Sequence, residues 1–461
     1  MTRSRTAAES AESGEAAEIV DVVAWEALDS RGRPTVACRV HLAGGAVGRA
    51  VVPSGASTGS HEAVERRDGG TRYGGWGVHG AVEAVRTELR AAVVGLDATR
   101  QDVVDARLEE ADGTPDLRRT GANAVLAVSL ATALAGARAL GLPLWRSLGR
   151  TDGADDPADP DDAPAPVLLP MPMVNVFSGG AHAARAIDLQ DVLAVPVGAG
   201  SFAYGLELAD RVRTATAALL DSRGAGTGLV ADEGGLAAPL PTNEAALALV
   251  TEGIEAAGLT PGRDVALAVD LAASQFGTAD GTYRLRCEDR VLDRDGWLAE
   301  VSRWCDRYPI VSLEDVLHED DWEGWTLAAR TLPDDRQLLG DDLFATHLDR
   351  VEKGIDCQAA NAVLVKPNQA GTLSRAQRVL RRAQQAGLAT VVSARSGDTE
   401  DSWLADLAVG WRAGQVKVGS TTRSERTAKW NRLLELEHDL GDAAVLADRS
   451  VLGTSSRGLG R

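Results

Sequence analysis

The chain has 461 residues, enough for two or three domains at roughly 100–200 residues per domain. Hydrophobic residues make up 44% and charged residues 25% of it, the balance of a soluble globular protein. Acidic side chains outnumber basic ones by 67 to 48, a net charge of −19, which argues against nucleic acid as a partner because phosphate binding needs a basic face.

Hydropathy and cysteine spacing indicate the cellular compartment in which the protein works. No apolar run approaches the roughly 20 residues of a membrane span, and we recognise no signal peptide at the start. We therefore expect a cytoplasmic protein that has no membrane partner. The four cysteines are too widely spaced for a zinc site or a disulfide framework, as in a reducing compartment: Cys38, Cys287, Cys305 and Cys357.

The first third of the chain is expected to form a disordered lead and then an α+β domain. Residues 1–18, MTRSRTAAESAESGEAAE, are small and polar, which is typical of disorder. Residues 19–150 contain strand-like runs (TVACRVHLAGGAVGRAVV) and then helical ones (GANAVLAVSLATALAGARALG), the order of an α+β domain. Residues 151–166 are rich in Asp, Pro and Ala, which predicts an exposed linker at a domain boundary.

Residues 167–448 repeat a unit of one strand and one helix, and residues 449–461 are expected to be a tail. Successive polar positions from Glu314 to Lys417 lie 27, 25, 27 and 24 residues apart, about one unit each. Such units predict a parallel sheet, and closure into a barrel brings every C-terminal strand end to one face. Six apolar runs end at, or pass, polar residues of this kind: Asp270, Glu314, Asp341, Lys366, Ser393 with Arg395, and Lys417.

A single polar residue at a strand end is more often a helix cap or a turn residue than part of a site. Six strand ends of this kind in succession instead indicate one polar cavity at the C-terminal face of a barrel. Three of the residues, Asp270, Glu314 and Asp341, would form an oxygen-only site suited to Mg²⁺.

Two lysines beside a divalent ion can perform different tasks. One of Lys366 and Lys417 could pair with a substrate carboxylate, and the other, pushed toward its neutral form by nearby positive charge, could act as a base. A metal ion on a carboxylate makes the adjacent carbon acidic, so the residues predict proton abstraction next to a carboxylate.

Long motifs between residues 22 and 440 resemble those of the enolase family. The resemblance implies an α/β fold, namely an enolase-type modified (β/α)8 TIM barrel with an N-terminal α+β capping domain. It also implies Mg²⁺-dependent interconversion of 2-phosphoglycerate and phosphoenolpyruvate by a homodimer or a larger homo-oligomer such as an octamer. The motifs are LDSRGRPTV, VPSGASTGSHEAVERRDG, GANAVLAVSLA, DEGGLAAPL, SLEDVLHEDDWEGW, GDDLFATH, KPNQAGTL, SARSGDTEDSWLADLAVG and GQVKVGSTTRSER.

The resemblance also assigns the chemistry to positions in this chain. Lys366 in VLVKPNQ resembles the base that removes the proton from the carbon bearing the phosphate, and Glu233 in ADEGG resembles the acid that helps hydroxide leave. Ser57 in SGASTG matches the mobile-loop serine that reaches a second Mg²⁺ once substrate is bound. The ligands of the tightly held Mg²⁺ are matched by Asp270, Glu314 and Asp341.

Five further positions match contacts to the substrate. Arg395 and Ser396 match the phosphate contacts, while Lys417 and Gln190 match contacts to the remaining substrate oxygens. His182 in GGAHAAR matches a loop histidine that closes over the site. Taken alone, a single histidine would more often be structural, so this assignment depends on the surrounding motifs.

Several positions depart from the family pattern. Ala394 stands where histidine is usual, which removes an imidazole from the wall beside the phosphate site. Asp191 is one methylene shorter than the usual glutamate, which helps to hold the leaving hydroxyl and the acid. Arg185 replaces a common asparagine on the loop that closes over the substrate. Pro367 follows the base, and Gln275 replaces a usual glutamate.

These departures enlarge the expected pocket and make it more cationic. We therefore expect a bulkier and more anionic phosphorylated or phosphonylated hydroxy acid as substrate, as in the carboxyphosphonoenolpyruvate synthases of phosphonate biosynthesis. A divergent housekeeping enolase is the alternative. A non-catalytic enolase fold that binds a partner is disfavoured, because the base, the acid and the metal ligands are all present. Racemases of the wider superfamily are disfavoured because they lack the Arg-Ser pair and the SGASTG loop.

Overall fold

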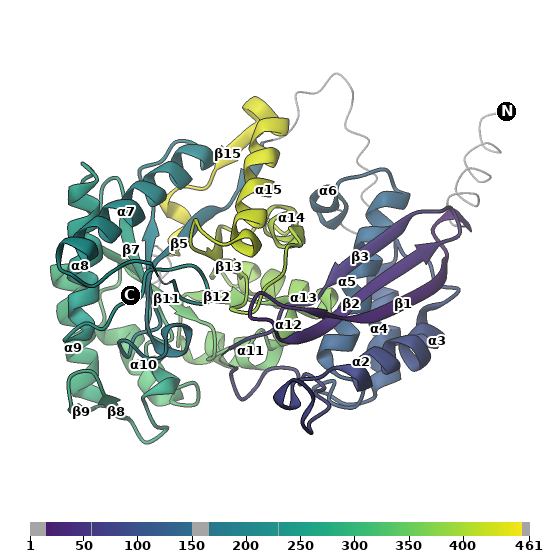
Figure 1. Ribbon diagram of the computed structural model, residues 1–461, viewed down its shortest axis with the longest axis horizontal. Coiled ribbons are helices and arrows are strands. Elements are labelled where there is room, and N and C mark those ends of the chain that lie inside the picture. The colour runs from purple at the N-terminus through teal and green to yellow at the C-terminus, as the bar shows by residue number, and fades with distance from the viewer. Residues whose placement is uncertain (1–14, 57, 150–165, 229, 454–461) are drawn as a thin grey trace.

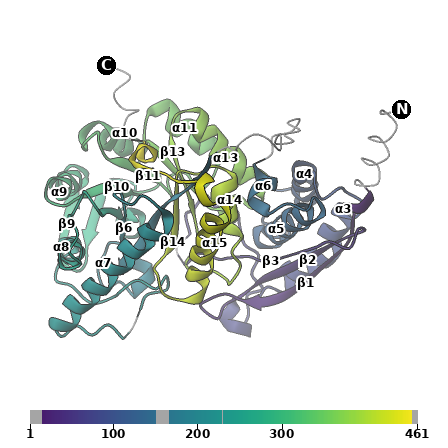
Figure 2. The same ribbon diagram turned by 90° about the horizontal axis from the view of Figure 1, so that it is seen from above.

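The computed structural model describes residues 15–56, 58–149, 166–228 and 230–453. Figures 1 and 2 show two parts side by side, an N-terminal part with a sheet and helices, and a larger barrel surrounded by helices. The expected α/β class and the order of the two parts are confirmed.

The N-terminal part consists of one antiparallel sheet covered by helices. Strands β1 (Ile19–Leu28), β2 (Pro34–Leu42) and β3 (Val47–Val51) pair in sequence order. Gly48 lets the sheet and helix α5 approach closely, because a Cβ atom there would lie 1.8 Å from the Ala131 carbonyl oxygen. The helices are α2 (His79–Ala84), a π turn (Val85–Leu89), α3 (Arg90–Val93), α4 (Gln101–Asp112), α5 (Ala122–Ala139) and α6 (Leu144–Leu148).

Helix α5 is the most apolar helix of this part. Its 18 residues have a mean hydropathy of 1.4 and would suffice, by length and composition, to cross a membrane. However, 83% of the helix is buried inside the protein, where it packs on β2 and β3. This burial is typical of the core helix of a globular domain.

The larger part is a closed barrel of eight strands. Seven strands are parallel, and their buried apolar sequences are those of strands covered on both faces. Side chains at alternate positions, among them Met173, Leu193, Ala268 and Leu364, form a cluster inside the barrel. The strands are β5 (Met171–Ser178), β6 (Asp191–Val195), β7 (Ala266–Asp270), β10 (Ile310–Glu314), β11 (Gln337–Gly340), β12 (Ala362–Val365), β13 (Ala389–Ser393) and β14 (Gln415–Gly419).

Strand β6 runs against its two neighbours, which modifies the barrel topology. It pairs antiparallel with both β5 and β7, and two helices, α7 and α8, separate it from β7. Its first residue, Asp191, therefore pairs with Asp270 and Ser178 at the C-terminal ends of β7 and β5. The face that collects seven strand ends thus also receives the beginning of β6.

Helices surround the barrel, and side chains of Ser, Thr and Asp cap several of their N-termini. Ser201, Thr242, Asp293, Asp321 and Thr372 each accept a backbone N–H from the first helical turn. The helices are α7 (Phe202–Ser222), α8 (Asn243–Ala256), α9 (Arg294–Arg307), α10 (Trp322–Thr331), α11 (Leu348–Cys357), α12 (Pro367–Ala370), α13 (Leu373–Gln385), α14 (Trp403–Gly410) and α15 (Ser424–Leu440).

Two pairs of short strands complete the fold, and two segments of the chain differ from the sequence prediction. Strands β4 (Val167–Leu169) and β15 (Ala444–Leu446) pair in parallel, and β8 (Thr282–Leu285) and β9 (Arg290–Asp293) form a hairpin. Residues 15–18, expected to be disordered, are ordered because Ala43 and Gly44 in the turn after β2 and Ala98 in a later loop donate hydrogen bonds to their carbonyls. A 3₁₀ turn at Arg449–Leu452 buries Leu452, so the expected tail begins with ordered structure. Most of the expected linker lies outside the described residues.

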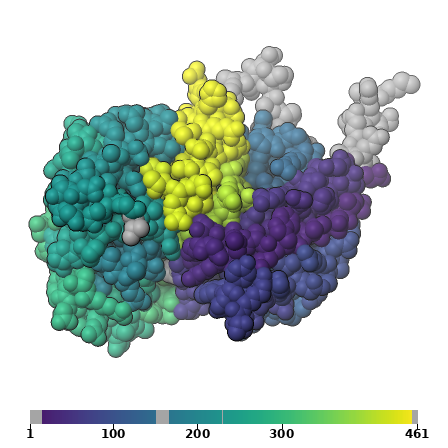
Figure 3. Space-filling model, viewed as in Figure 1, coloured from purple at the N-terminus to yellow at the C-terminus, as the bar shows by residue number. Residues whose placement is uncertain are grey.

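The two parts pack closely on the face shown in Figure 3. The N-terminus of α13 is capped from the N-terminal part, because Ser374 N–H donates to Asp105 Oδ2 (2.9 Å) and Leu373 N–H donates to Ser129 Oγ (3.0 Å). Burial raises the pKa of Asp105 to about 6. The contact therefore relies on buried polar groups as well as apolar packing.

Candidate active site

A small polar cavity, of about 20 Å³, lies at the C-terminal end of the barrel strands. The predicted base, the predicted acid and the predicted anion contacts line it together, although they come from distant parts of the sequence. Its lining residues are His182, Gln190, Glu233, Lys366, Ser393, Ala394, Arg395, Ser396 and Lys417.

The predicted metal carboxylates lie directly behind this lining. Lys417 Nζ lies 2.7 Å from Asp270 Oδ2 and 2.7 Å from both carboxylate oxygens of Glu314. Burial alone lowers the pKa of Lys417, but the charges of Asp270 and Glu314 outweigh it and raise this pKa well above its ordinary value. The ammonium group and these two carboxylates therefore form one buried ionic cluster.

The environment of the predicted metal carboxylates suits a divalent cation. Asp270 Oδ1 is buried and has no hydrogen-bond partner within the described part of the chain. Burial and the charge of Asp270 raise the pKa of Glu314 well above its ordinary value, because negative charge is crowded here. Hard oxygen ligands in excess of nearby positive charge fit Mg²⁺, for which Asp270, Glu314 and Asp341 are the predicted ligands. Three acidic oxygens that lie within 4.8 Å of one another belong to Asp315, Asp341 and Asp342, so of the predicted ligands Asp341 belongs to this cluster.

Lys366 emerges from the end of β12 and contacts Asp341 through an ion pair. Burial lowers the pKa of Lys366, but the Asp341 carboxylate outweighs burial and raises it. The prediction of a lysine held neutral concerned a lysine beside a bound divalent ion, so it stays a prediction for Lys366. Pro367 begins α12 at its first helical position, where a proline fits without strain, so it leaves Lys366 in extended backbone.

Asp191 acts on the cavity through His182 and does not itself line it. Asp191 Oδ2 lies 2.9 Å from His182 Nδ1, and Asp191 Oδ1 accepts hydrogen bonds from Asn175 Nδ2 and Ser178 Oγ. Burial lowers the pKa of His182, but the charges of Asp191 and then Glu233 outweigh burial and raise it to about 9. Glu233 Oε1 lies 3.8 Å from His182 Nε2. A protonated imidazole therefore separates the shorter carboxylate, Asp191, from the predicted acid.

Gln190 links this group to the metal carboxylates. Its Nε2 donates to Asp270 Oδ2 at 3.1 Å, and its Oε1 accepts from Gln275 Nε2. Gln275 Oε1 in turn accepts the Ala181 N–H at 3.0 Å. The amide at position 275 thus fixes both Gln190 and the beginning of the His182 loop.

The predicted anion contacts are held from the N-terminal part. Arg395 forms a two-pronged ion pair with Glu62, with nitrogen–oxygen distances of 2.8 and 3.1 Å. Ser396 Oγ accepts the Ala56 N–H at 2.6 Å. The Ala394 methyl lines the cavity beside Ser393 and Arg395, so this position of the wall presents no polar side chain.

One predicted residue, Arg185, is placed elsewhere, and another, Ser57, is not described. Arg185 lies on an exposed turn in the left-handed region (φ 60°) and does not line the central cavity. It lines a neighbouring hollow with Gly180, Asp188, Gln275, Phe276 and Arg286. Ser57 lies outside the described residues, so its predicted metal contact stays a prediction.

Sequence reasoning missed three supporting residues. Glu62 holds Arg395, Gln369 Nε2 donates to Asp341 Oδ1 at 2.9 Å, and Asp315 Oδ1 accepts the Asp341 N–H at 3.0 Å. Glu62 and Gln369 stand inside the quoted motifs HEAVERRDG and KPNQ, next to positions that were assigned. Their position within these motifs was the available signal, but only the fold shows what each one contacts.

Comparison with known protein families agrees with this site and fold. The family described as "Enolase, N-terminal domain" matches residues 19–148, and the family described as "Enolase, C-terminal TIM barrel domain" matches residues 166–454. The second match alone covers more than half of the chain. The expected family and the modified barrel are confirmed, and the chain belongs to the enolase family, whose members are lyases.

Proposed function

We propose that this protein is a Mg²⁺-dependent hydro-lyase that removes water from a 2-phosphoglycerate-like acid to give a phosphoenolpyruvate-type product. One observation carries the proposal. A single cavity is lined by an amine (Lys366), a carboxylic acid (Glu233) and an Arg-Ser pair, and three buried carboxylates lie against it.

The roles follow from the chemistry of these groups. Lys366 takes the proton next to the substrate carboxylate once its contact with Asp341 is lost, because only the neutral amine is a base. Glu233 gives a proton to the departing hydroxyl, and the Arg395 guanidinium binds the phosphoryl group. Mg²⁺ held by Asp270, Glu314 and Asp341 would supply positive charge against the substrate carboxylate.

We further propose that the substrate is bulkier and more anionic than 2-phosphoglycerate, as for a carboxyphosphonoenolpyruvate synthase. The Ala394 methyl leaves the wall beside Arg395 without an imidazole, which gives room next to the phosphorus substituents. Arg185 and Arg286 line the neighbouring hollow and could attract an additional negative charge. A phosphonylated hydroxy acid matches this arrangement.

A divergent housekeeping enolase that acts on 2-phosphoglycerate is the second candidate. It is favoured by the presence of every group needed for dehydration in one cavity. Either enzyme would work in a reducing cytoplasm as a homo-oligomer, and the four free cysteines support that compartment.

The test is turnover of 2-phosphoglycerate by the purified protein with Mg²⁺, measured by the ultraviolet absorbance of the enolpyruvyl product. Little turnover that Ala394→His partly restores would support a pocket adapted to another phosphoryl or phosphonyl acid. A kcat/KM in the usual range of about 10⁴–10⁸ M⁻¹s⁻¹ would instead support the housekeeping enzyme. Absence of turnover on both 2-phosphoglycerate and phosphonylated analogues would reject the hydro-lyase.

A further inference from the structure

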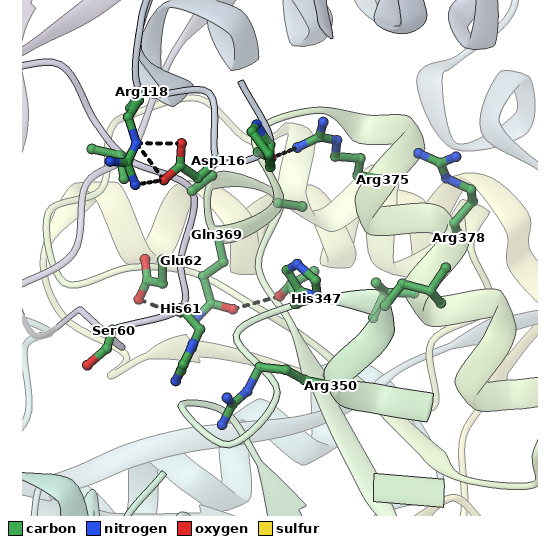
Figure 4. Close-up of a pocket in the computed structure, with 17 residues that line it drawn as sticks. Ser60, His61, Glu62, Asp116, Arg118, His347, Arg350, Gln369, Arg375 and Arg378 are labelled. Atoms are coloured by element: carbon green, nitrogen blue, oxygen red, sulfur yellow. Dashed lines mark hydrogen bonds and ion pairs between the residues drawn. The ribbon is translucent and has the colours of Figure 1, made fainter. Parts of the chain in front are cut away.

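A second cavity, of about 610 Å³, opens between the two parts of the protein (Figure 4). This volume falls within the roughly 300–1,000 Å³ of small-molecule sites. One side comes from the loops at residues 60–64 and 115–118, and the other from α11, α12, α13 and the loop before α11. We call this cavity the interdomain cleft.

The interdomain cleft is cationic in a strongly acidic protein. Four arginines, Arg118, Arg350, Arg375 and Arg378, line it against two carboxylates, Glu62 and Asp116, while the whole chain has a net charge of −19. Figure 4 shows Arg118 across the opening from Arg375 and Arg378. This local excess of positive charge favours an anion.

Much of the wall is fixed before any ligand arrives. Arg375 spans the domain boundary, because it donates to the Pro115 carbonyl (3.0 Å) and pairs with Glu109 (2.9 Å). Arg350 donates to the Leu343 and Glu319 carbonyls, each at 2.6 Å. These contacts hold the shape of the cleft.

Two cationic or potentially cationic groups are left without partners. Within the described part of the chain, neither the Arg378 guanidinium nor the His347 imidazole makes a hydrogen bond or an ion pair. Both residues are exposed and line the cleft. They can therefore bind an anionic group without first breaking an internal contact.

The rest of the lining combines four polar residues, Ser60, His61, Thr346 and Gln369, with six apolar ones, which suit a ligand with a carbon body. The apolar lining consists of Ala63, Val64, Pro115, Leu348, Ala370 and Val379. We propose that the interdomain cleft is a binding site for an organic phosphate or a chemically similar anion, its charged group on Arg378 and His347 and its carbon body on this apolar lining. The proposal does not depend on the reaction at the central cavity.

The test is calorimetric titration of the full-length protein with phenyl phosphate, which combines a dianion with an apolar ring and lacks a carboxylate. Arg378→Glu should weaken binding about tenfold or more, because it removes a charge-assisted hydrogen bond and adds repulsion. Arg381→Glu is the matched control, since it changes the charge equally at another exposed position of α13 that lies outside the cleft. This control should stay within about twofold of the wild type.

Three results would overturn the proposal. The first is wild-type protein that does not bind phenyl phosphate. The second is binding that Arg378→Glu leaves intact, because the anion would then occupy another site. The third is an affinity for inorganic phosphate equal to that for phenyl phosphate, because the apolar lining would then contribute nothing to binding.

Discussion

The ion pair between Glu62 and Arg395 offers a quantitative test of how the two parts are joined. Its side chains are only 8% and 3% exposed, and both guanidinium nitrogens face the carboxylate. Burial lowers the pKa of Arg395, but Glu62 outweighs burial and raises it, so the pair remains charged. The Glu62→Gln substitution keeps the shape of the side chain and removes the charge.

The expected cost is about 2–4 kcal/mol of unfolding free energy. Removing one partner of a buried ion pair costs about 3–5 kcal/mol, because the remaining charge is left uncompensated. The amide oxygen of glutamine can still accept one hydrogen bond, worth about 1 kcal/mol, which reduces the loss.

Urea unfolding of the wild type and the variant measures this cost. Glu65→Gln is the matched control, since Glu65 pairs with Arg67 on the same loop but is 21% exposed, and its loss should cost about 1 kcal/mol or less. Equal losses in the two variants would refute the reasoning, because burial would then make no difference to the pair.

Three further predictions concern the core, the histidine and the metal. Gly48→Ala should cost about 2 kcal/mol or more, because its Cβ would lie 1.8 Å from the Ala131 oxygen; an unchanged urea midpoint would contradict the close helix–sheet contact. The pKa of His182 is raised from 6.5 to about 9, so its stabilising contribution is complete below pH 6.5 and is lost as the pH rises through 9. The unfolding free energy of the wild type minus that of His182→Gln should therefore fall by about 3 kcal/mol over this range, and a constant difference would reject the raised pKa. Mg²⁺ at a concentration one hundred times its Kd should raise the unfolding free energy of the wild type by about 2.7 kcal/mol, and EDTA should reverse this gain. Asp270→Asn should lose most of the gain, and equal stabilisation of the variant would place the ion elsewhere.

The strand ends were the most predictable part of the molecule. Apolar runs ending at Asp270, Glu314 and Lys366 are the ends of β7 and β10 and the residue after β12. A parallel strand buried on both faces has a near-continuous apolar sequence, so its polar boundary is visible without a structure. The same signal does not report direction. The antiparallel course of β6 was not predicted, since the family resemblance implied only a modified topology, and it explains why Asp191 meets the site from the beginning of its strand.

Contacts between distant segments could not be predicted in the same way. The loop carrying Glu62 and the turn carrying Arg395 are separated by 333 residues, and no local pattern pairs a particular acid with a particular base over such a distance. Loop residues show the same limit, since Arg185 was assigned to the substrate from its position in a motif but lines a neighbouring hollow. The ion pair of Lys366 with Asp341 was likewise not visible in the sequence, although both residues were assigned to the site.

These contacts show that the barrel and the N-terminal part contribute different groups to the candidate site. The barrel alone supplies the predicted metal carboxylates, the predicted base and Lys417, each within a strand or next to its end. The predicted anion contacts are different, because Arg395 is oriented by Glu62, Ser396 is bonded to Ala56, and Ser54 and Gly397 exchange backbone hydrogen bonds of 2.7 and 2.9 Å. Docking of the N-terminal part would therefore complete the proposed anion site as well as cover it. A substitution that loosens the domain contact should thus weaken anion binding before it disturbs the metal carboxylates, even where the substituted residue never touches substrate.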